Sequence, residues 1–249
     1  MEIVVCVKRV PDSAARIQIA ADGKSIDRSG VEHVISPYDE IALECALQLR
    51  EKHGGTVTAV CLGPAEAVKE LRQALAMGAD KAVHVKDAGG GRGPHGTATV
   101  LAEAIRARPH DVVLFGKQSI DSDNCAVGVI VASLLELPIV TLAVRLEIAE
   151  GRATAHREAE GGTEVVEVRL PAAFSAQRGL AEPRYPSIKG IMAAKKKPIE
   201  EVDAPAPAGA LVVEALELPP ARKGGRIVGK GPEAVPELVR LLRQDAKVL

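Results

Sequence analysis

The chain has 249 residues, of which 47% are hydrophobic, so it is long enough to bury one substantial core. Its 32 Lys and Arg residues are balanced by 33 Asp and Glu residues, which excludes a global field that would attract nucleic acid or an anionic membrane surface. Aromatic residues make up only 2% and Trp is absent, so the stacking platforms of single-strand nucleic-acid binders are missing. The core is therefore expected to be aliphatic.

The first residues predict a strand and not a targeting segment, because no basic region precedes their apolar run and no small-residue cleavage site follows it. No apolar stretch approaches the roughly 20 residues that span a bilayer, so no membrane insertion is expected. The four cysteines, Cys6, Cys45, Cys61 and Cys125, have no C-x-x-C spacing and predict neither a metal site nor a disulfide framework. We expect a cytoplasmic location.

Short β-branched runs alternate with amphipathic stretches through the first 145 residues, a pattern typical of βαβ units and a parallel sheet. The runs are almost continuously apolar, as strands covered by helices on both faces should be. The predicted strands are residues 2–7, 56–62, 81–85, 111–115 and 138–144. The fold class is therefore α/β, with a mostly parallel sheet and helices on both faces.

The first predicted helix begins after Ser36-Pro37 and ends at Gly54. Ser36 is expected to cap it, and Pro37 suits the first helical position. Two further helices are predicted at about 65–77 and 97–107.

A glycine cluster at residues 87–96 invites comparison with phosphate-binding loops. It lacks the Lys-Ser/Thr pair of a Walker loop, and no G-x-G-x-x-G directly follows a strand. A flexible surface loop is the better interpretation.

Beyond residue 145 polar and apolar residues alternate, and a hairpin is predicted from 152–158 and 164–170, joined around Gly161-Gly162. After a last apolar run, the proline-containing segment 177–198 is expected to run extended over the surface. We therefore predict one α/β domain over 1–202, which includes the hairpin.

The remaining residues, 203–249, are predicted to form a C-terminal arm. It starts with a stiff Pro-Ala linker at 203–210, continues with a strand pattern at 211–218 and ends in a helix at about 232–243. Such a tail cannot build its own core, so we expect it to pack against something else.

Residues 111–135 are the most informative stretch, because a buried strand is followed by a polar loop and by a helix predicted to begin near Asp123 or Asn124. At the carboxyl end of a parallel strand, a helix N-terminus offers free N–H groups and a positive dipole to an anionic ligand. On spacing alone, an ordinary turn in which Asp121, Ser122 and Asp123 cap the helix explains these residues slightly better.

Other strand ends of the same sheet could contribute to one crevice with that loop. Cys6, residues 36–39 and Leu62 end or follow these strands, although each is also explained as a buried strand residue or a helix cap. The histidines are dispersed, and no Ser or Cys occupies a nucleophile elbow. No catalytic set is predicted, so the chain is not expected to be an enzyme.

Five motifs together resemble the β subunit of electron transfer flavoproteins, in order and with nearly constant spacing over residues 1 to about 202. They are VCVKRVPDS, SPYDEIALECAL, AVCLGPAEAVKELRQALAMGADKAVHV, LFGKQSIDSD and LAEPRYPSIKGIMAAKKKPIE. The resemblance implies a Rossmann-like, adenine-nucleotide-binding fold that holds one structural AMP. It also implies that FAD lies mostly on the α subunit, near the interface.

By motif position, the resemblance places AMP contacts on two groups of residues. They are Cys6, Ser36, Pro37, Tyr38, Asp39 and Leu62, and the loop residues Gly116, Lys117, Gln118, Ser119, Ile120, Asp121, Ser122, Asp123, Asn124, Cys125, Ala126 and Val127. Tyr38 replaces an aromatic beside the flavin, and Ser13 stands where some members have another. Cys125, Ala126 and Val127 replace amide and hydroxyl side chains, so backbone N–H groups would have to hold the phosphate.

The resemblance also implies contacts with other proteins. Glu158 matches an acidic residue that bridges to the flavin domain of the α subunit, and residues from about 176 to 198 match a loop that docks onto dehydrogenases. The predicted docking residues are Arg184, Tyr185, Ile188, Ile191 and Met192, with Ile188 as the apolar anchor.

The implied function is that of an electron carrier subunit, which takes electrons from acyl-CoA and related dehydrogenases of fatty acid oxidation and delivers them to a quinone reductase. A bifurcating subunit with a second FAD in place of AMP is disfavoured, because Ile120 and residues 122–127 differ from the G-D-T-A-Q pattern of that branch. A free-standing adenine-nucleotide-binding protein would not need the docking segment or the tail. An ATP-dependent ligase would need a pyrophosphate loop.

Overall fold

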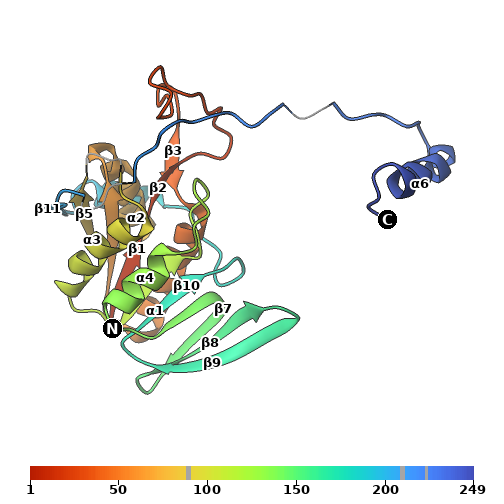
Figure 1. Ribbon diagram of the computed structural model, residues 1–249. Helices are drawn as coiled ribbons and strands as arrows, with labels where there is room; N and C mark the ends of the chain where they lie inside the picture. Colours follow the sequence, from red (N-terminus) through yellow and green to blue (C-terminus); the bar gives the residue numbers. More distant parts are fainter. Residues whose placement is uncertain (88–90, 208–210, 222–223) are drawn as a thin grey trace. The chain divides into compact units, whose positions relative to one another are not determined.

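A computed structural model describes residues 1–87, 91–207, 211–221 and 224–249 (Figure 1). The chain divides into two compact units, Met1–Ala215 and Leu216–Leu249, and each is described by itself. Residues 88–90 of the glycine cluster and residues 208–210 of the predicted linker lie outside the described residues.

The first unit is built on a nine-stranded sheet, with the strand order β11-β5-β4-β1-β6-β10-β7-β8-β9. The strands are β1 (Glu2–Cys6), β4 (Thr56–Gly63), β5 (Lys81–Lys86), β6 (Val112–Gly116), β7 (Ile139–Ala149), β8 (Arg152–Ala159), β9 (Gly162–Arg169), β10 (Ala172–Ala176) and β11 (Ile199–Asp203). Neighbouring strands are parallel from β11 to β7, whereas β8 and β9 add antiparallel pairs. The predicted α/β class and the hairpin are confirmed.

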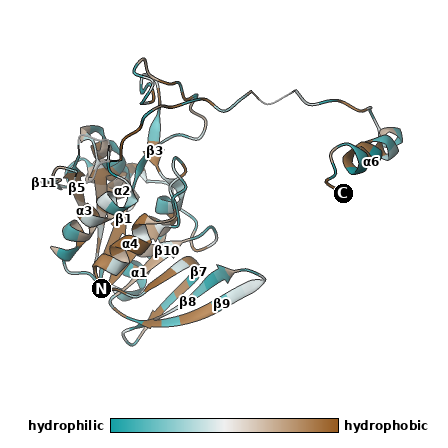
Figure 2. Cartoon of the chain, viewed as in Figure 1, coloured by the Kyte–Doolittle hydropathy of each residue, from teal (hydrophilic) through white to brown (hydrophobic). Residues whose placement is uncertain are grey.

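Helices cover both faces of the parallel part of the sheet (Figure 1). Helices α1 (Pro37–His53) and α2 (Val68–Met77) pack on one face, and α3 (Pro94–Arg106) and α4 (Val127–Leu134) pack on the other. Apolar side chains fill both layers, and the central strands form the apolar middle of the unit (Figure 2). The helices thus leave the ends of the strands as the place where a ligand could reach the sheet.

Helix α1 begins and ends as its sequence predicts, although not by the expected cap. Pro37 occupies the first turn with Asp39, and Gly54 ends the helix with a positive φ of 71°. The Ser36 side chain makes no capping hydrogen bond, so the prediction that Ser36 caps α1 is wrong.

Several elements differ from the sequence-based expectations. Helix α3 begins earlier than predicted, at Pro94, and a short second sheet joins β2 (Arg9–Pro11) to β3 (His33–Ile35). The surface segment 177–198 is not wholly extended, because it contains helix α5 (Ile188–Ala194), which Ser187 caps by accepting the Gly190 N–H at 3.0 Å. The predicted strand at 211–218 is absent from the described residues there.

The second unit carries the predicted terminal helix. A single turn of 3₁₀ helix at Pro232–Ala234 leads into α6 (Val235–Gln244), whose Val235 and Leu238 are exposed. Its polar side is held by an ion pair between Arg240 and Glu237. Among the described helices of both units, none combines the length and the apolar character that a bilayer crossing requires.

Phe174 tests the packing of the sheet, because it lies fully buried in β10 between β6 and β7. We expect Phe174→Ala to lower the free energy of unfolding by about 3–5 kcal/mol, since the lost ring leaves a cavity. Val165→Ala on β9, where the side chain is 62% exposed, should change it by less than about 0.5 kcal/mol. Chemical unfolding measures both variants, and equal effects would contradict this account of the core.

Candidate functional site

The carboxyl ends of β1, β4 and β6 meet at one edge of the sheet. Cys6 ends β1, Leu62 lies near the end of β4, and Gly116 ends β6. Ser36 joins them because its N–H donates to the Lys8 carbonyl oxygen at 2.9 Å. The structure therefore brings together four of the positions that the sequence analysis placed in one crevice.

Asp39 connects three elements at this edge. One carboxylate oxygen accepts the Lys8 N–H and the other accepts the Gly116 N–H, both at 2.9 Å. Gly116 leaves no room for a side chain, because an added Cβ would collide with the Asp39 carboxylate and lie 2.7 Å from Tyr38 Cβ. The start of α1 is thus locked against the ends of β1 and β6.

The environment of Asp39 favours its neutral form. Burial raises the pKa of this carboxyl from 3.8 to about 7, although the two backbone hydrogen bonds and the charge of Lys8 lower it, while Asp121 raises it further. Burial also raises the pKa of the neighbouring Cys6 thiol, so Cys6 serves as a small buried side chain and not as a nucleophile.

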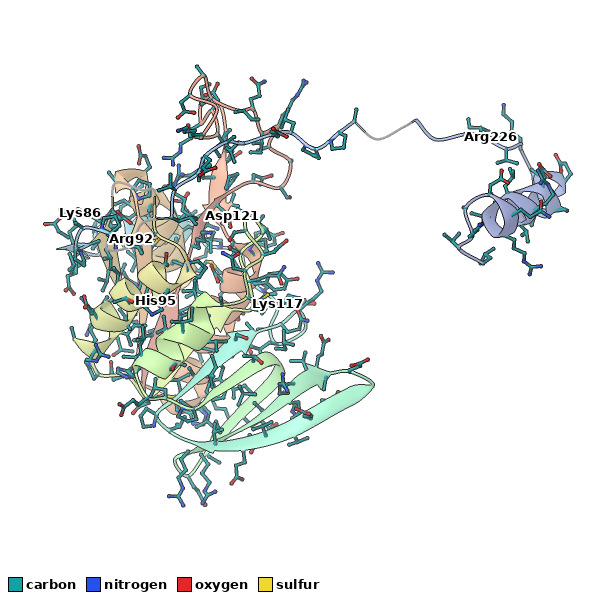
Figure 3. The ribbon with its side chains drawn as sticks, viewed as in Figure 1. Lys86, Arg92, His95, Lys117, Asp121 and Arg226 are labelled. Carbon is teal, nitrogen blue, oxygen red and sulfur yellow. The ribbon has the colours of Figure 1, made fainter. Side chains whose placement is uncertain are left out.

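The loop after β6 is held by side chains at both of its ends. Lys8 Nζ binds both carboxylate oxygens of Asp121 at 2.7 Å and donates to Ser119 Oγ at 3.2 Å. Asp121 and Lys117 are labelled in Figure 3. Gln118 donates to Asp123 at 2.6 Å and accepts from the Cys125 thiol at 3.2 Å. Lys8 was not among the predicted site residues, although its place in the motif VCVKRVPDS, two residues after Cys6, could have indicated it.

Helix α4 begins at Val127, so the prediction of a start near Asp123 or Asn124 is wrong. The reason is local, because Asp123 and Cys125 have φ values of 50° and 52°, which a right-handed helix does not allow. No side chain among the described residues caps α4. Its first N–H groups therefore point out of the helix without an intrahelical partner, as an anion site requires.

Ser36 supplies an independent indication of a ligand. Its side chain is fully buried, yet its hydroxyl oxygen has no hydrogen-bond partner among the described residues. A buried polar atom without a partner costs about 1–3 kcal/mol, so such atoms in native proteins call for an explanation. A polar ligand atom at this edge of the sheet would satisfy the hydroxyl.

A cavity of about 640 Å³ adjoins the loop on the side of α1. Its lining includes Ser13, Tyr38, Ile120, Asp121 and Arg178. It therefore brings together the two positions, Ser13 and Tyr38, that the resemblance places near a flavin. Lys117 Nζ lies 4.9 Å from the centre of the Tyr38 ring, and Arg178, which the sequence analysis placed in the docking loop and not at this site, adds a second cation.

The predicted docking residues come from two other parts of the chain, β8 and the segment after β10. Glu158 on β8 accepts a hydrogen bond from Gln177 at 2.6 Å. Tyr185 and Ile188 are 96% and 84% exposed, and Ile191 and Met192 are exposed as well. Arg184, in contrast, directs its guanidinium toward α1. In the described part of the chain, no cluster of His, Cys, Asp and Glu could hold a metal ion.

The parallel sheet, its two helical layers and the polar loop at the strand ends define an α/β protein with its candidate site at the carboxyl edge of the sheet. The sequence model of the electron transfer flavoprotein domain matches residues 24–207. The chain is 42% identical over 259 residues to "Electron transfer flavoprotein subunit beta" of Bacillus subtilis, with 100% of both chains covered. It is 37% identical over 257 residues to the protein of the same name from Homo sapiens, with 100% of this chain and 99% of the relative covered. The chain therefore belongs to the electron transfer flavoprotein family, among its beta subunits.

The pH dependence of stability tests the environment of Asp39. Folding raises its pKa from 3.8 to about 7, so the folded chain keeps a proton that the unfolded chain has released between these values. The contribution of Asp39 to stability is complete below pH 3.8 and falls by up to about 1.4 kcal/mol per pH unit until it is lost near pH 7.

In Asp39→Asn this contribution to the slope should disappear when chemical unfolding is compared with the wild type between about pH 5 and 7. The variant should also be less stable throughout, because an amide can accept only one of the two backbone N–H groups. An unchanged slope would assign the titration to another group.

Proposed function

We propose that the chain is the β subunit of a heterodimeric electron transfer flavoprotein that works in the cytoplasm. It binds AMP structurally and helps to hold FAD at the interface with the α subunit. The heterodimer carries electrons from acyl-CoA and related dehydrogenases to a quinone reductase. The observation that carries this proposal is the similarity over the full length to proteins named electron transfer flavoprotein subunit beta, from a bacterium to human.

The edge of the sheet fits an adenine nucleotide that stays bound without reacting. The buried Ser36 hydroxyl would receive a polar atom of AMP, and the free N–H groups at the start of α4 would hold its phosphate. Cys125, Ala126 and Val127 lack the amide and hydroxyl groups that are common in the family. Backbone N–H groups would therefore supply most of the hydrogen bonds to the phosphate. The role of AMP here is to help the two subunits assemble.

The cavity that contains Ser13 and Tyr38 fits the part of FAD that reaches this subunit. FAD supplies the redox chemistry when it is bound, and the protein supplies position and electrostatics. Lys117 and Arg178 would place two cations near the bound cofactor, and Tyr38 would offer an aromatic surface beside it.

The exposed apolar residues of the C-terminal arm fit a role in assembly with the α subunit. Leu211 and Val212 are exposed, and α6 leaves Val235 and Leu238 uncovered among the described residues. Burying such a surface on a partner would stabilise the heterodimer.

Analysis of the released nucleotide tests the proposed AMP site. The intact heterodimer, denatured by heat and filtered, should release one AMP per β chain, and the purified protein should not turn AMP over. Gly116→Ala should abolish AMP retention, because its Cβ would collide with the Asp39 carboxylate. Gly96→Ala is the matched control, since an added Cβ there meets only Arg92 Cβ at an ordinary 3.8 Å.

Detection of FAD alone in the wild type, two molecules per heterodimer, would favour the bifurcating alternative. Release of no adenine nucleotide other than a single FAD would overturn the assignment of the site.

Ile188→Ala tests the docking surface. Because the side chain is 84% exposed, its loss should not lower the melting temperature, the AMP content or the flavin absorbance. It should weaken binding to an acyl-CoA dehydrogenase by about 2 kcal/mol, the typical effect of truncating an apolar anchor.

Binding and melting are measured on the same preparation of heterodimer. Val165→Ala removes an exposed side chain of the same type from β9 and serves as the control. Equal affinity of both variants for the dehydrogenase would contradict the docking role of Ile188.

A further inference from the structure

The segment Pro183–Lys197 exposes four apolar side chains, Tyr185, Ile188, Ile191 and Met192. It contains one short helix, the seven-residue α5. A helix of this length is not stable by itself in water, so its conformation depends on contacts with the rest of the chain. Those contacts determine whether Tyr185 and Ile188 are held in a position to meet a partner.

Arg184 makes the strongest of these contacts, at the start of the segment. Its Nε and Nη2 bind the two carboxylate oxygens of Glu44, each at 2.8 Å, and its backbone N–H donates to the same carboxylate at 3.3 Å. Its Nη1 also binds Glu51 at 2.6 Å. Bidentate pairing of this kind fixes the orientation of the guanidinium as well as its position.

Glu44 faces into the protein from the middle of α1, and its side chain is only 4% exposed. Burial raises the pKa of this carboxyl, but hydrogen bonds from Arg184 and Gln48 outweigh burial and leave the pKa below its ordinary value. A buried carboxylate without a partner would be strongly destabilising. The ionised Glu44 therefore depends on Arg184 and ties the segment to α1.

The far end of the segment is attached to the end of α2. Arg72 Nη1 donates to the Ala194 carbonyl oxygen at 2.7 Å, and Lys197 Nζ donates to the Ala79 carbonyl oxygen at 2.5 Å. Gly190 lies flush against α2, where an added Cβ would collide with the Ala76 carbonyl oxygen.

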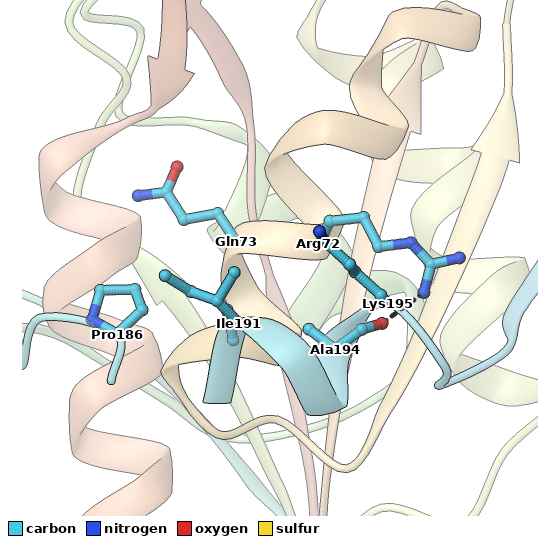
Figure 4. Close-up of a pocket in the computed structure, with 7 residues that line it drawn as sticks. Arg72, Gln73, Pro186, Ile191, Ala194 and Lys195 are labelled. Carbon is cyan, nitrogen blue, oxygen red and sulfur yellow. Dashed lines mark hydrogen bonds between the residues drawn. The ribbon is translucent and has the colours of Figure 1, made fainter. Parts of the chain in front are cut away.

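Between its two attachments the segment crosses a hollow. A groove of about 500 Å³ lies beside the contact at Gly190 and is lined by α2 and by the chain that carries Pro186 and Ile191 (Figure 4). Arg72 and Gln73 line the groove from α2. Close packing on α2 holds the segment at Gly190, whereas Pro186 borders the groove, so the position of the residues between Arg184 and Gly190 depends on the attachment of Arg184.

We infer that Arg184 is a positioning residue of the docking surface: by pairing with Glu44 it holds the segment in the conformation that projects Tyr185 and Ile188. The inference rests on the proposed function of this segment in binding dehydrogenases. It differs from the sequence-based prediction for Arg184, because a guanidinium occupied by two carboxylates of α1 acts through its neighbours and not by touching the partner.

Steady-state kinetics of the heterodimer test the inference. The variants Arg184→Gln, Glu44→Gln and their combination are compared as electron acceptors of an acyl-CoA dehydrogenase that reduces the wild type. If each single variant leaves about a tenth of the molecules in the docking conformation, the KM for the heterodimer rises about tenfold, while kcat is unchanged. The double variant should be no worse than either single variant, because both remove the same interaction.

Arg184→Lys should restore part of the affinity, since an ammonium can pair with Glu44 but cannot bind it in a bidentate way. Glu167→Gln is the matched control, because it breaks an exposed pair with Arg152 on β8 and β9 and should leave the KM unchanged.

A raised KM in Arg184→Gln with a normal KM in Glu44→Gln would overturn the inference, because Arg184 would then contact the dehydrogenase directly. Normal KM values in both variants would overturn it as well. In either case a raised KM in Ile188→Ala would leave the proposed function standing. A normal KM in Ile188→Ala would refute the docking surface, and the inference would fall with it.

Hydrogen exchange separates positioning from general unfolding. In Glu44→Gln, the backbone amides from Tyr185 to Ala194 should exchange faster, while those of α1 keep the wild-type rate. Faster exchange in both places would show that the substitution disrupts the helix, and would overturn the inference.

Discussion

The carboxylate of Asp39 joins the ends of β1 and β6 to the start of α1 through two backbone hydrogen bonds. Both bonds are partly buried, so removing the carboxylate would leave two backbone N–H groups without the partner that holds them together. The same contact places Lys8, whose ammonium holds the loop after β6 through Asp121. The shape of the candidate site therefore follows from one side chain that need not touch a ligand.

Helix α1 serves two distant surfaces through two buried carboxylates that ionise differently. Asp39 accepts its two hydrogen bonds from backbone N–H groups, and burial outweighs these bonds and the charge of Lys8 and raises its pKa. Five residues later, Glu44 is also penalised by burial, but a guanidinium and an amide reverse the effect and lower its pKa. The first carboxylate orders the edge of the sheet, and the second attaches the segment with exposed Tyr185 and Ile188. A shift of α1 would therefore change both the edge of the sheet and the position of that segment.

The sequence predicts the central strands and the helices of the α/β fold well, because their apolar runs are long and their period is clear. It misses β11, whose Ile199–Asp203 sequence is charged as an edge strand tends to be, and it places the start of α4 too early. Asp123 and Cys125 adopt left-handed conformations that the local sequence pattern does not predict. The partner of Arg184 lies 140 residues away in the sequence, so only the folded chain can reveal it.

The position of β1 in the sheet has a consequence for the synthesis of the chain. β1 is made first but lies between β4 and β6, whose residues start at Thr56 and Val112. Contacts between such distant segments form slowly, because a long loop must close before the pairing stabilises it. During synthesis, Ile3, Val4 and Val5 therefore cannot pair on both sides until β6, which ends at Gly116, has left the ribosome. Strand β11 can pair with β5 only after Asp203 has been made. A strand that is almost wholly buried in the folded protein therefore remains partly unpaired while most of the sheet is still being made.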